Sequence, residues 1–270
     1  RQGGRCGHGR FRSGQVRTLR LPSALGGLVL ALASGCATVP AGPVAINPVD
    51  PWEAWNRKVF AFNESVDEAV LKPVARVYRD VVPQLVRTGV SNFFGNIGDV
   101  WSSINQLLQG RIEQGVSTFM RVAINTTFGL GGVLDVATEA RLPREKSDFG
   151  QTLGRWGVGS GPYVVLPFFG PSTLRDTAGM PVDLYGDLWT YKRPVRWRNV
   201  GAVVRIVDRR AQLLDASTLL EDAALDKYDF VRDAYLQRRR SLVFDGNEPP
   251  PEDPTAADPP PAPASVPAAK

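Results

Sequence analysis

One cysteine in this sequence is placed where it can be acylated. Cys36 ends the run Leu32-Ala33-Ser34-Gly35-Cys36, which follows an apolar stretch at residues 21–32 and the basic residues Arg17 and Arg20. A basic segment, an apolar segment and small residues before a cysteine form the layout of a lipoprotein export signal. We therefore predict diacylglyceryl and N-acyl groups on Cys36, because two or more chains hold a protein stably on a membrane.

The residues before Cys36 are interpreted as a signal peptide preceded by extra upstream sequence. Residues 1–15 are rich in Gly and Arg, and we place the true start at Val16. The apolar stretch is too short to span a bilayer. The alternative is an ordinary signal peptide cleaved near Ala33, with the cysteine incidental.

The composition after Cys36 excludes several kinds of chemistry. Six of the 32 basic residues and none of the 27 acidic residues precede Cys36, so 26 basic side chains face 27 acidic ones in the remainder. This balance removes the support for nucleic-acid binding that a basic chain would give. His8 and Cys6 also lie upstream, so nucleophilic triads and His-based metal sites lack their residues. With no Walker A pattern either, we predict no enzyme, no metal and no bound cofactor beyond the lipid on Cys36.

The elements that would carry a function lie between two segments of low complexity. Residues 36–47 are small and Pro-bearing, which is typical of a flexible tether between a lipid anchor and a body. Residues 245–270 are rich in Pro and Ala without periodicity, which predicts a disordered tail. The folded domain is therefore predicted to span residues 48–244.

Helical spacing dominates this domain and predicts an all-α fold. Asp50 is expected to cap a first helix that has Pro51 at its first position and ends near Lys72-Pro73. We interpret the later apolar stripes as core faces: Phe93, Ile97, Val100, Ile104 and Leu107; Ile112, Val116, Phe119 and Ala123; Val200, Val203, Val204, Val207, Ala211 and Leu214; Tyr228, Val231, Tyr235 and Leu242. No alternating strand pattern of any length is present. Residues 150–181 are rich in Gly and Pro, and their apolar run at 163–169 is too short and too interrupted to span a bilayer.

The first helix has aromatic residues on more than one side. Trp52 and Trp55 lie near its start, and Phe60 and Phe62 face different directions. Such a helix suits a headgroup boundary, where one side contacts protein and another contacts lipid.

Four blocks of residues carry a resemblance to a known family. They are Asp50-Pro51-Trp52-Glu53-Ala54-Trp55-Asn56-Arg57 with Phe60-Ala61-Phe62-Asn63; Arg79-Asp80 and Val82-Pro83-Gln84 with Ser91-Asn92-Phe93-Phe94; Asn125-Thr126-Thr127 with Gly129-Leu130-Gly131-Gly132 and Asp135-Val136-Ala137; and Asp148-Phe149-Gly150-Gln151-Thr152-Leu153-Gly154 with its continuation to Arg175-Asp176. In this order they resemble the MlaA (VacJ) family of lipoproteins, from Asp50 to about Leu220.

The resemblance implies a ring-shaped α-helical protein embedded in the inner leaflet of the Gram-negative outer membrane, on its periplasmic face, with a central amphipathic channel. It implies removal of phospholipids from the outer leaflet and their transfer to a soluble periplasmic carrier that feeds an inner-membrane ABC transporter. It also implies association with a trimeric porin. The chain departs from the family's pattern at Asp99-Val100, where an acidic residue before Pro is expected, and in residues 185–199.

Two groups of residues are predicted to contact or control the channel: Val59, Phe62 and Asn63; and Gly129, Gly131, Gly132 and Val133. The glycine group is either a hinge at the channel mouth or a tight turn between helices, since both need Gly. Phe62 and Asn63 either touch the channel or pack within the protein. Two other functions stay open: a structural lipoprotein that bridges the outer membrane to porin or cell wall, and a lipid-cleaving enzyme. The second lacks a His to activate Ser160 or Ser172.

Overall fold

The computed structural model describes residues 47–247. Cys36, the start at Val16, the tether at 36–46 and the tail from residue 248 lie outside the described residues, so the predictions about them stay predictions. The elements are α2 (Glu53–Val66), the π-helical turn η2 (Asp67–Leu71), α3 (Lys72–Val81), α4 (Gln84–Leu108), α5 (Ile112–Thr127), α6 (Val136–Glu139), α7 (Phe149–Arg155), β1 (Tyr163–Leu166), β2 (Gly170–Thr173), α8 (Leu174–Gly186), the 3-10 turn η3 (Leu188–Tyr191), α9 (Val195–Gln212), α10 (Leu214–Ala223) and α11 (Lys227–Phe244).

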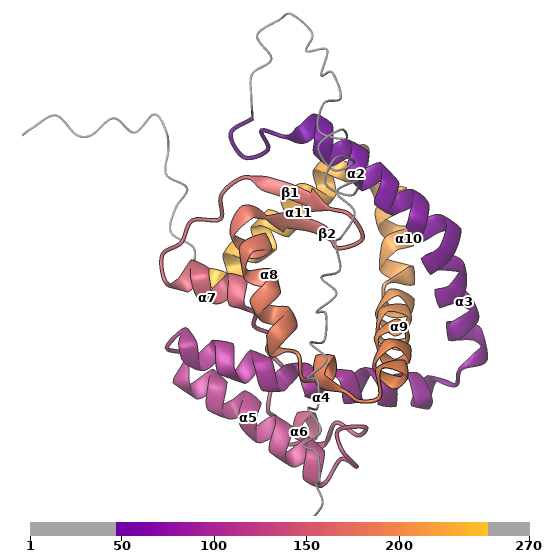
Figure 1. Ribbon diagram of the computed structural model, residues 1–270, viewed down its shortest axis with the longest axis vertical. Coiled ribbons are helices and arrows are strands. Elements are labelled where there is room, and N and C mark those ends of the chain that lie inside the picture. Colours follow the sequence, from indigo (N-terminus) through magenta and orange to yellow (C-terminus); the bar gives the residue numbers. More distant parts are fainter. Residues whose placement is uncertain (1–46, 248–270) are drawn as a thin grey trace, which may run out of the picture. The chain divides into compact units, whose positions relative to one another are not determined.

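These elements contact one another in a closed circuit. Following the contacts leads from α2 through η2, α3, α9, α4, α7, α8, β2 and β1 back to α2, as Figure 1 lets the reader trace. Helix α5 pairs along α4, α11 packs on α7 and β2, and α10 joins α3 to α9. The predicted ring-shaped, all-α fold is thereby confirmed, with one small hairpin added to it.

The first helix does not stop at Lys72-Pro73, so that prediction is wrong. The chain stays helical into α3, and Pro73 lies in the first turn of α3 directly after the π-helical turn η2. A proline inside a helix lacks an N–H and clashes with the carbonyl four residues earlier. The wider π-helical turn separates these groups and lets two helical segments follow each other.

Asp50 is not the helix cap that its position predicted. The N-cap is Trp52, without a side-chain bond, and the Asp50 carboxylate is buried. It accepts hydrogen bonds from Asn56 Nδ2 at 2.8 Å and from the Tyr228 hydroxyl. A tertiary contact to α11 thus takes the place of the local cap.

A two-stranded hairpin lies in the Gly- and Pro-rich stretch, where the sequence shows no alternating strand pattern. Strands β1 and β2 are antiparallel, with Tyr163 opposite Thr173 and Leu166 opposite Gly170. The strands are four residues each, too short for a sequence period to indicate them. Asn56 fixes β1 from the neighbouring helix: its Nδ2 donates to Tyr163 O and its Oδ1 accepts from Val165 N.

Candidate functional site

Helices α4 and α5 bury their polar sides and expose apolar ones. In α5, Gly115, Thr118, Arg121 and Asn125 are buried. The stripe that the sequence predicted as core faces outward: Ile112 is 60%, Val116 52% and Phe119 60% exposed. In α4, Ile104 and Leu107 are also exposed, whereas Asn105 and Gln106 are fully buried. The core interpretation is wrong for these exposed residues, whereas Phe93, Ile97 and Val100 of the same α4 stripe are half-buried. Helical spacing identifies a face and not its surroundings.

An arginine at the centre of α5 organises the buried polar side. The Arg121 side chain is fully buried, and its Nη2 lies 2.9 Å from both carboxylate oxygens of Asp135. Its Nη1 donates to Thr138 Oγ1 and to the carbonyl of Leu142. Burial opposes ionisation of Asp135, but hydrogen bonds from Thr138 and Asn125 and the charge of Arg121 outweigh it and lower the pKa of Asp135 to about 2.

Asp99 and Arg144 extend this network along α4. Asp99 is fully buried, and its Oδ2 lies 3.0 Å from Arg144 Nε and 4.0 Å from Arg121 Nε. Burial raises the pKa of Asp99 even though both arginines oppose the shift. Asp99 is thus a buried partner of both arginines. It belongs to the pair Asp99-Val100, at which the sequence departs from the family's pattern.

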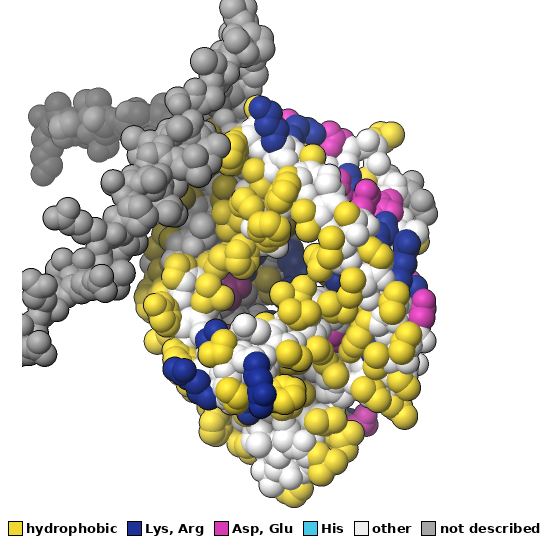
Figure 2. Space-filling model, turned by 45° about the vertical axis from the view of Figure 1, so that its right-hand side comes forward, with side chains coloured by type: hydrophobic (Ala, Val, Ile, Leu, Met, Phe, Trp, Pro, Cys, Tyr) yellow, Lys and Arg dark blue, Asp and Glu magenta, His cyan; other side chains and the backbone are white. Residues whose placement is uncertain are grey.

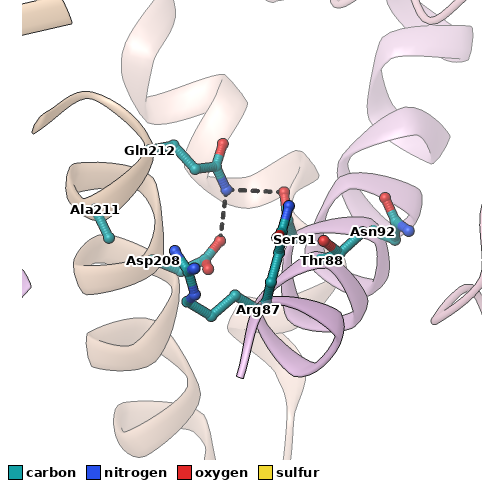
Figure 3. A pocket seen from close by; sticks show the side chains of 8 residues that line it. Arg87, Thr88, Ser91, Asn92, Asp208, Ala211 and Gln212 are labelled. Carbon is teal, nitrogen blue, oxygen red and sulfur yellow. Dashed lines mark hydrogen bonds between the residues drawn. The ribbon is translucent and has the colours of Figure 1, made fainter. Parts of the chain in front are cut away.

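A polar cavity lies between the start of α4 and the end of α9 (Figure 3). It has a volume of about 260 Å³ and is lined by Gln84, Arg87, Thr88, Ser91, Asn92, Asp208, Ala211 and Gln212. Gln212 Nε2 donates to Ser91 Oγ at 2.9 Å and to Asp208 Oδ2 at 2.8 Å, so the amide links the two helices. Burial raises the pKa of Asp208. This lining suits a small polar group better than an acyl chain.

The predicted residues of α2 all face the hairpin. Val59 is buried beside Tyr163, Val165 and Tyr228. Phe62 is half-exposed and its ring contacts Phe168 edge to face, with centroids 5.4 Å apart.

Asn63 holds the turn of the hairpin in place. Its Nδ2 donates to Leu166 O at 3.0 Å, and its Oδ1 accepts from Phe168 N at 2.8 Å. Phe168 has a φ of 65°, a left-handed conformation that costs energy for a residue with a Cβ. The two bonds of Asn63 therefore stabilise a strained turn with an exposed phenylalanine at its tip.

Replacing Asn63 with alanine is expected to lower the free energy of unfolding by about 1–2 kcal/mol, because two backbone groups lose their partner. Thermal or denaturant unfolding of the purified protein measures this. Phe62→Ala is the matched variant, since it removes the ring contact and keeps both bonds. An Asn63→Ala protein as stable as the wild type would show that the turn holds without the amide.

The predicted glycine group forms a turn packed against α4. Gly131 and Gly132 have φ values of 72° and 93°, and Leu130, which precedes them, has a φ of 54°. Gly132 N donates to Asn125 O at 2.9 Å, and Asn92 Nδ2 donates to Val133 O at 3.2 Å. These positions have the geometry of a tight turn, and a role in channel control stays a prediction.

The two predicted groups do not come together. The residues of α2 lie beside the hairpin, whereas the glycine turn follows α5 at the opposite part of the circuit in Figure 1. The sequence reasoning missed Arg121, Asp135, Asp99 and Arg144, which make up the buried network. The spacing of Thr118, Arg121 and Asn125 on one helical side was the signal that could have found part of it.

Within residues 47–247, no group of three or more His, Cys, Asp or Glu side chains could hold a metal ion. None of the helices described there is long and apolar enough to cross a membrane.

Comparisons with known proteins agree with this architecture. The family model described as MlaA lipoprotein matches residues 48–242. Two relatives named intermembrane phospholipid transport system lipoprotein MlaA, from Shigella flexneri and Escherichia coli K12, are 41% and 40% identical, each over 82% of this chain and 88% of the relative. A solved structure described as "Structural basis for maintenance of bacterial outer membrane lipid asymmetry" has a TM-score of 0.64 and 42% identity, covering 72% of this chain and 98% of the other. With its helical circuit and its match to the family model over residues 48–242, this chain belongs to the MlaA lipoprotein family.

Proposed function

We propose that this protein is an outer-membrane lipoprotein that removes mislocalised phospholipids from the outer leaflet and passes them to a periplasmic carrier, maintaining lipid asymmetry. The names of the relatives from Shigella flexneri and Escherichia coli support phospholipid transport, and the solved structure, which concerns outer-membrane lipid asymmetry, supports the place where it acts. The chain covers 88% of each of these two relatives, so nearly all of each one's length has a counterpart here.

The observation that carries the proposal is the reversed polarity of the helices. A phospholipid has a charged head and apolar chains, so a route for it needs a polar lining and apolar surroundings. Helices α4 and α5 bury their polar sides and turn apolar sides outward, and Figure 2 shows hydrophobic side chains around a hollow with charged side chains inside it. Helices can line such a route in a membrane because their backbone groups are paired internally.

The same polarity supports embedding in the inner leaflet of the outer membrane. Helix α3 and the turn before it expose Val70, Val74, Val77 and Val81 at helical spacing, whereas Ala75 is buried. Isolated apolar residues are ordinary on a soluble surface, but a continuous stripe marks a contact with lipid or protein. Acylation of Cys36 would add the anchor that keeps this body at the periplasmic face.

We propose that the protein's partners are a trimeric porin and a soluble periplasmic lipid carrier. The carrier would connect it to an inner-membrane ABC transporter. The chain itself needs no energy source if the carrier binds lipid more tightly than it does. Lipid cleavage has no support, because no histidine lies among residues 47–247 to activate a serine. A purely structural bridge to porin or cell wall would not require a charged interior.

Deleting the gene is expected to raise phospholipid in the outer leaflet, and the intact gene is expected to reverse this. An acyl-transferring outer-membrane phospholipase can serve as the reporter. Complementation by Cys36→Ala should fail although the body folds, because the protein leaves the membrane. Unchanged outer-leaflet phospholipid in the deletion strain would favour the structural bridge.

A further inference from the structure

Two arginines approach one face of α4, and the charges of both, together with that of Arg209, act on Lys146. Arg144 and Lys146 come from the segment before α7, and Arg205 and Arg209 come from α9. A Cβ on Gly95 would lie 2.7 Å from Arg144 Nη1, and one on Gly98 would lie 3.9 Å from Arg205 Nη2. The two glycines therefore leave the room in which the guanidinium groups approach the helix. We call these four residues the cation cluster.

The cluster carries more positive charge than its acids neutralise. Arg144 pairs with Asp99, and Arg205 pairs with Asp187. The other two cations form no ion pair with any residue in 47–247. Asp99 is also shared with Arg121, and Asp135 lies 2.9 Å from Arg121 Nη2 and 4.0 Å from Arg144 Nη2, so five cations face the three carboxylates of Asp99, Asp135 and Asp187. Two positive charges are thus left in excess at one place.

The surroundings of Arg144 and Lys146 fit an anion-binding site. Arg144 Nη2 is buried and has no hydrogen-bond acceptor among the described residues, and Asp135 Oδ2 lies 4.0 Å from it, beyond hydrogen-bond distance. Lys146 is reached by solvent, yet burial and the charges of Arg209 and Arg144 lower its pKa. That combination is expected for a side chain lining a recess. A bound oxyanion would supply both the missing acceptor and the missing charge.

The cation cluster continues into the polar cavity. Thr88, Ser91, Gly95 and Gly98 follow one another at spacings of three and four, so they share one side of α4. Thr88 and Ser91 line the cavity together with Asp208 and Gln212 of α9, the helix that also carries Arg205 and Arg209. The phosphate and the polar group attached to it would therefore find adjacent places between the same two helices.

We propose that the cation cluster binds the phosphate of a phospholipid headgroup and favours headgroups with a net negative charge over zwitterionic ones. This inference rests on the proposed function and names the lipid chemistry that the interior would select. Charge-assisted hydrogen bonds are strongest where protein excludes water, and a zwitterionic head brings a cation of its own into the same cluster.

The test uses the purified full chain in detergent, titrated with phosphatidylglycerol and, separately, with phosphatidylethanolamine. The double variant Lys146→Gln/Arg209→Gln is expected to weaken phosphatidylglycerol binding at least tenfold, since one charged hydrogen bond corresponds to about that factor, and to weaken phosphatidylethanolamine binding less. Both side chains lack ion pairs within residues 47–247, so the variant should fold. Arg76→Gln, an exposed cation on α3, is the control and should bind like the wild type.

Each outcome decides something. Equal phosphatidylglycerol affinity in the wild type and the double variant would overturn the cluster's role. Millimolar inorganic phosphate that binds with the same dependence on Lys146 and Arg209, while lipid binding is unaffected, would assign the cluster to free phosphate and overturn the lipid assignment. A wild-type protein that binds neither lipid would instead count against the proposed function.

Discussion

Replacing Arg121 with methionine is expected to lower the free energy of unfolding by about 3–5 kcal/mol, the cost typical of removing one partner from a buried ion pair. The guanidinium of Arg121 is fully buried, and its Nη2 donates to both carboxylate oxygens of Asp135. Methionine fills much of the volume, so the loss reports the uncompensated carboxylates and not a cavity. Denaturant unfolding in the same detergent, followed by far-ultraviolet circular dichroism, measures the change.

Two further variants make this result specific. Arg76→Met on the exposed side of α3 should change stability by no more than about 0.5 kcal/mol. Adding Asp135→Asn to Arg121→Met should recover part of the loss, because it removes the charge left unpaired. A loss below about 1 kcal/mol for Arg121→Met would mean that water reaches the network and that the interior is more open than its burial indicates.

The fold class could be predicted from the sequence because helical spacing runs through the whole body. What the spacing could not give was the direction of each face. A stripe such as Ile112, Val116 and Phe119 has the same period whether it faces a core or a lipid, and here it faces outward. The same ambiguity explains Asp50: its position predicts a local cap, whereas in the fold it accepts bonds from Asn56 and Tyr228.

The cation cluster was harder to predict than the fold, because its residues are distant in sequence. Arg144 and Arg205 are sixty-one positions apart, and only the packing of α9 and the segment before α7 on α4 brings them to one place. The sequence left Asn63 either touching the channel or packed within the protein, and in the structure its amide forms two bonds to the hairpin turn. Which backbone groups it would bond could not be read from the sequence.

Replacing Gly129 with alanine is expected to destabilise the protein by about 3 kcal/mol, the upper part of the range for overpacked sites. A Cβ there would lie 2.2 Å from Leu134 O and 2.5 Å from Asn125 O. Both are backbone atoms, which cannot rotate away as a flexible side chain could. Unfolding measurements on the purified variant give the magnitude.

Gly131→Ala is the matched control in the same turn. Its Cβ would meet nothing within 4 Å, so only its φ of 72° opposes the change, at about 1–2 kcal/mol. A tight turn predicts that Gly129→Ala costs clearly more than Gly131→Ala. A hinge that opens easily predicts small and similar losses of stability together with altered lipid transfer, because opening relieves the contact with Leu134. Measuring unfolding and transfer on the same pair of variants therefore separates the two interpretations of this glycine group.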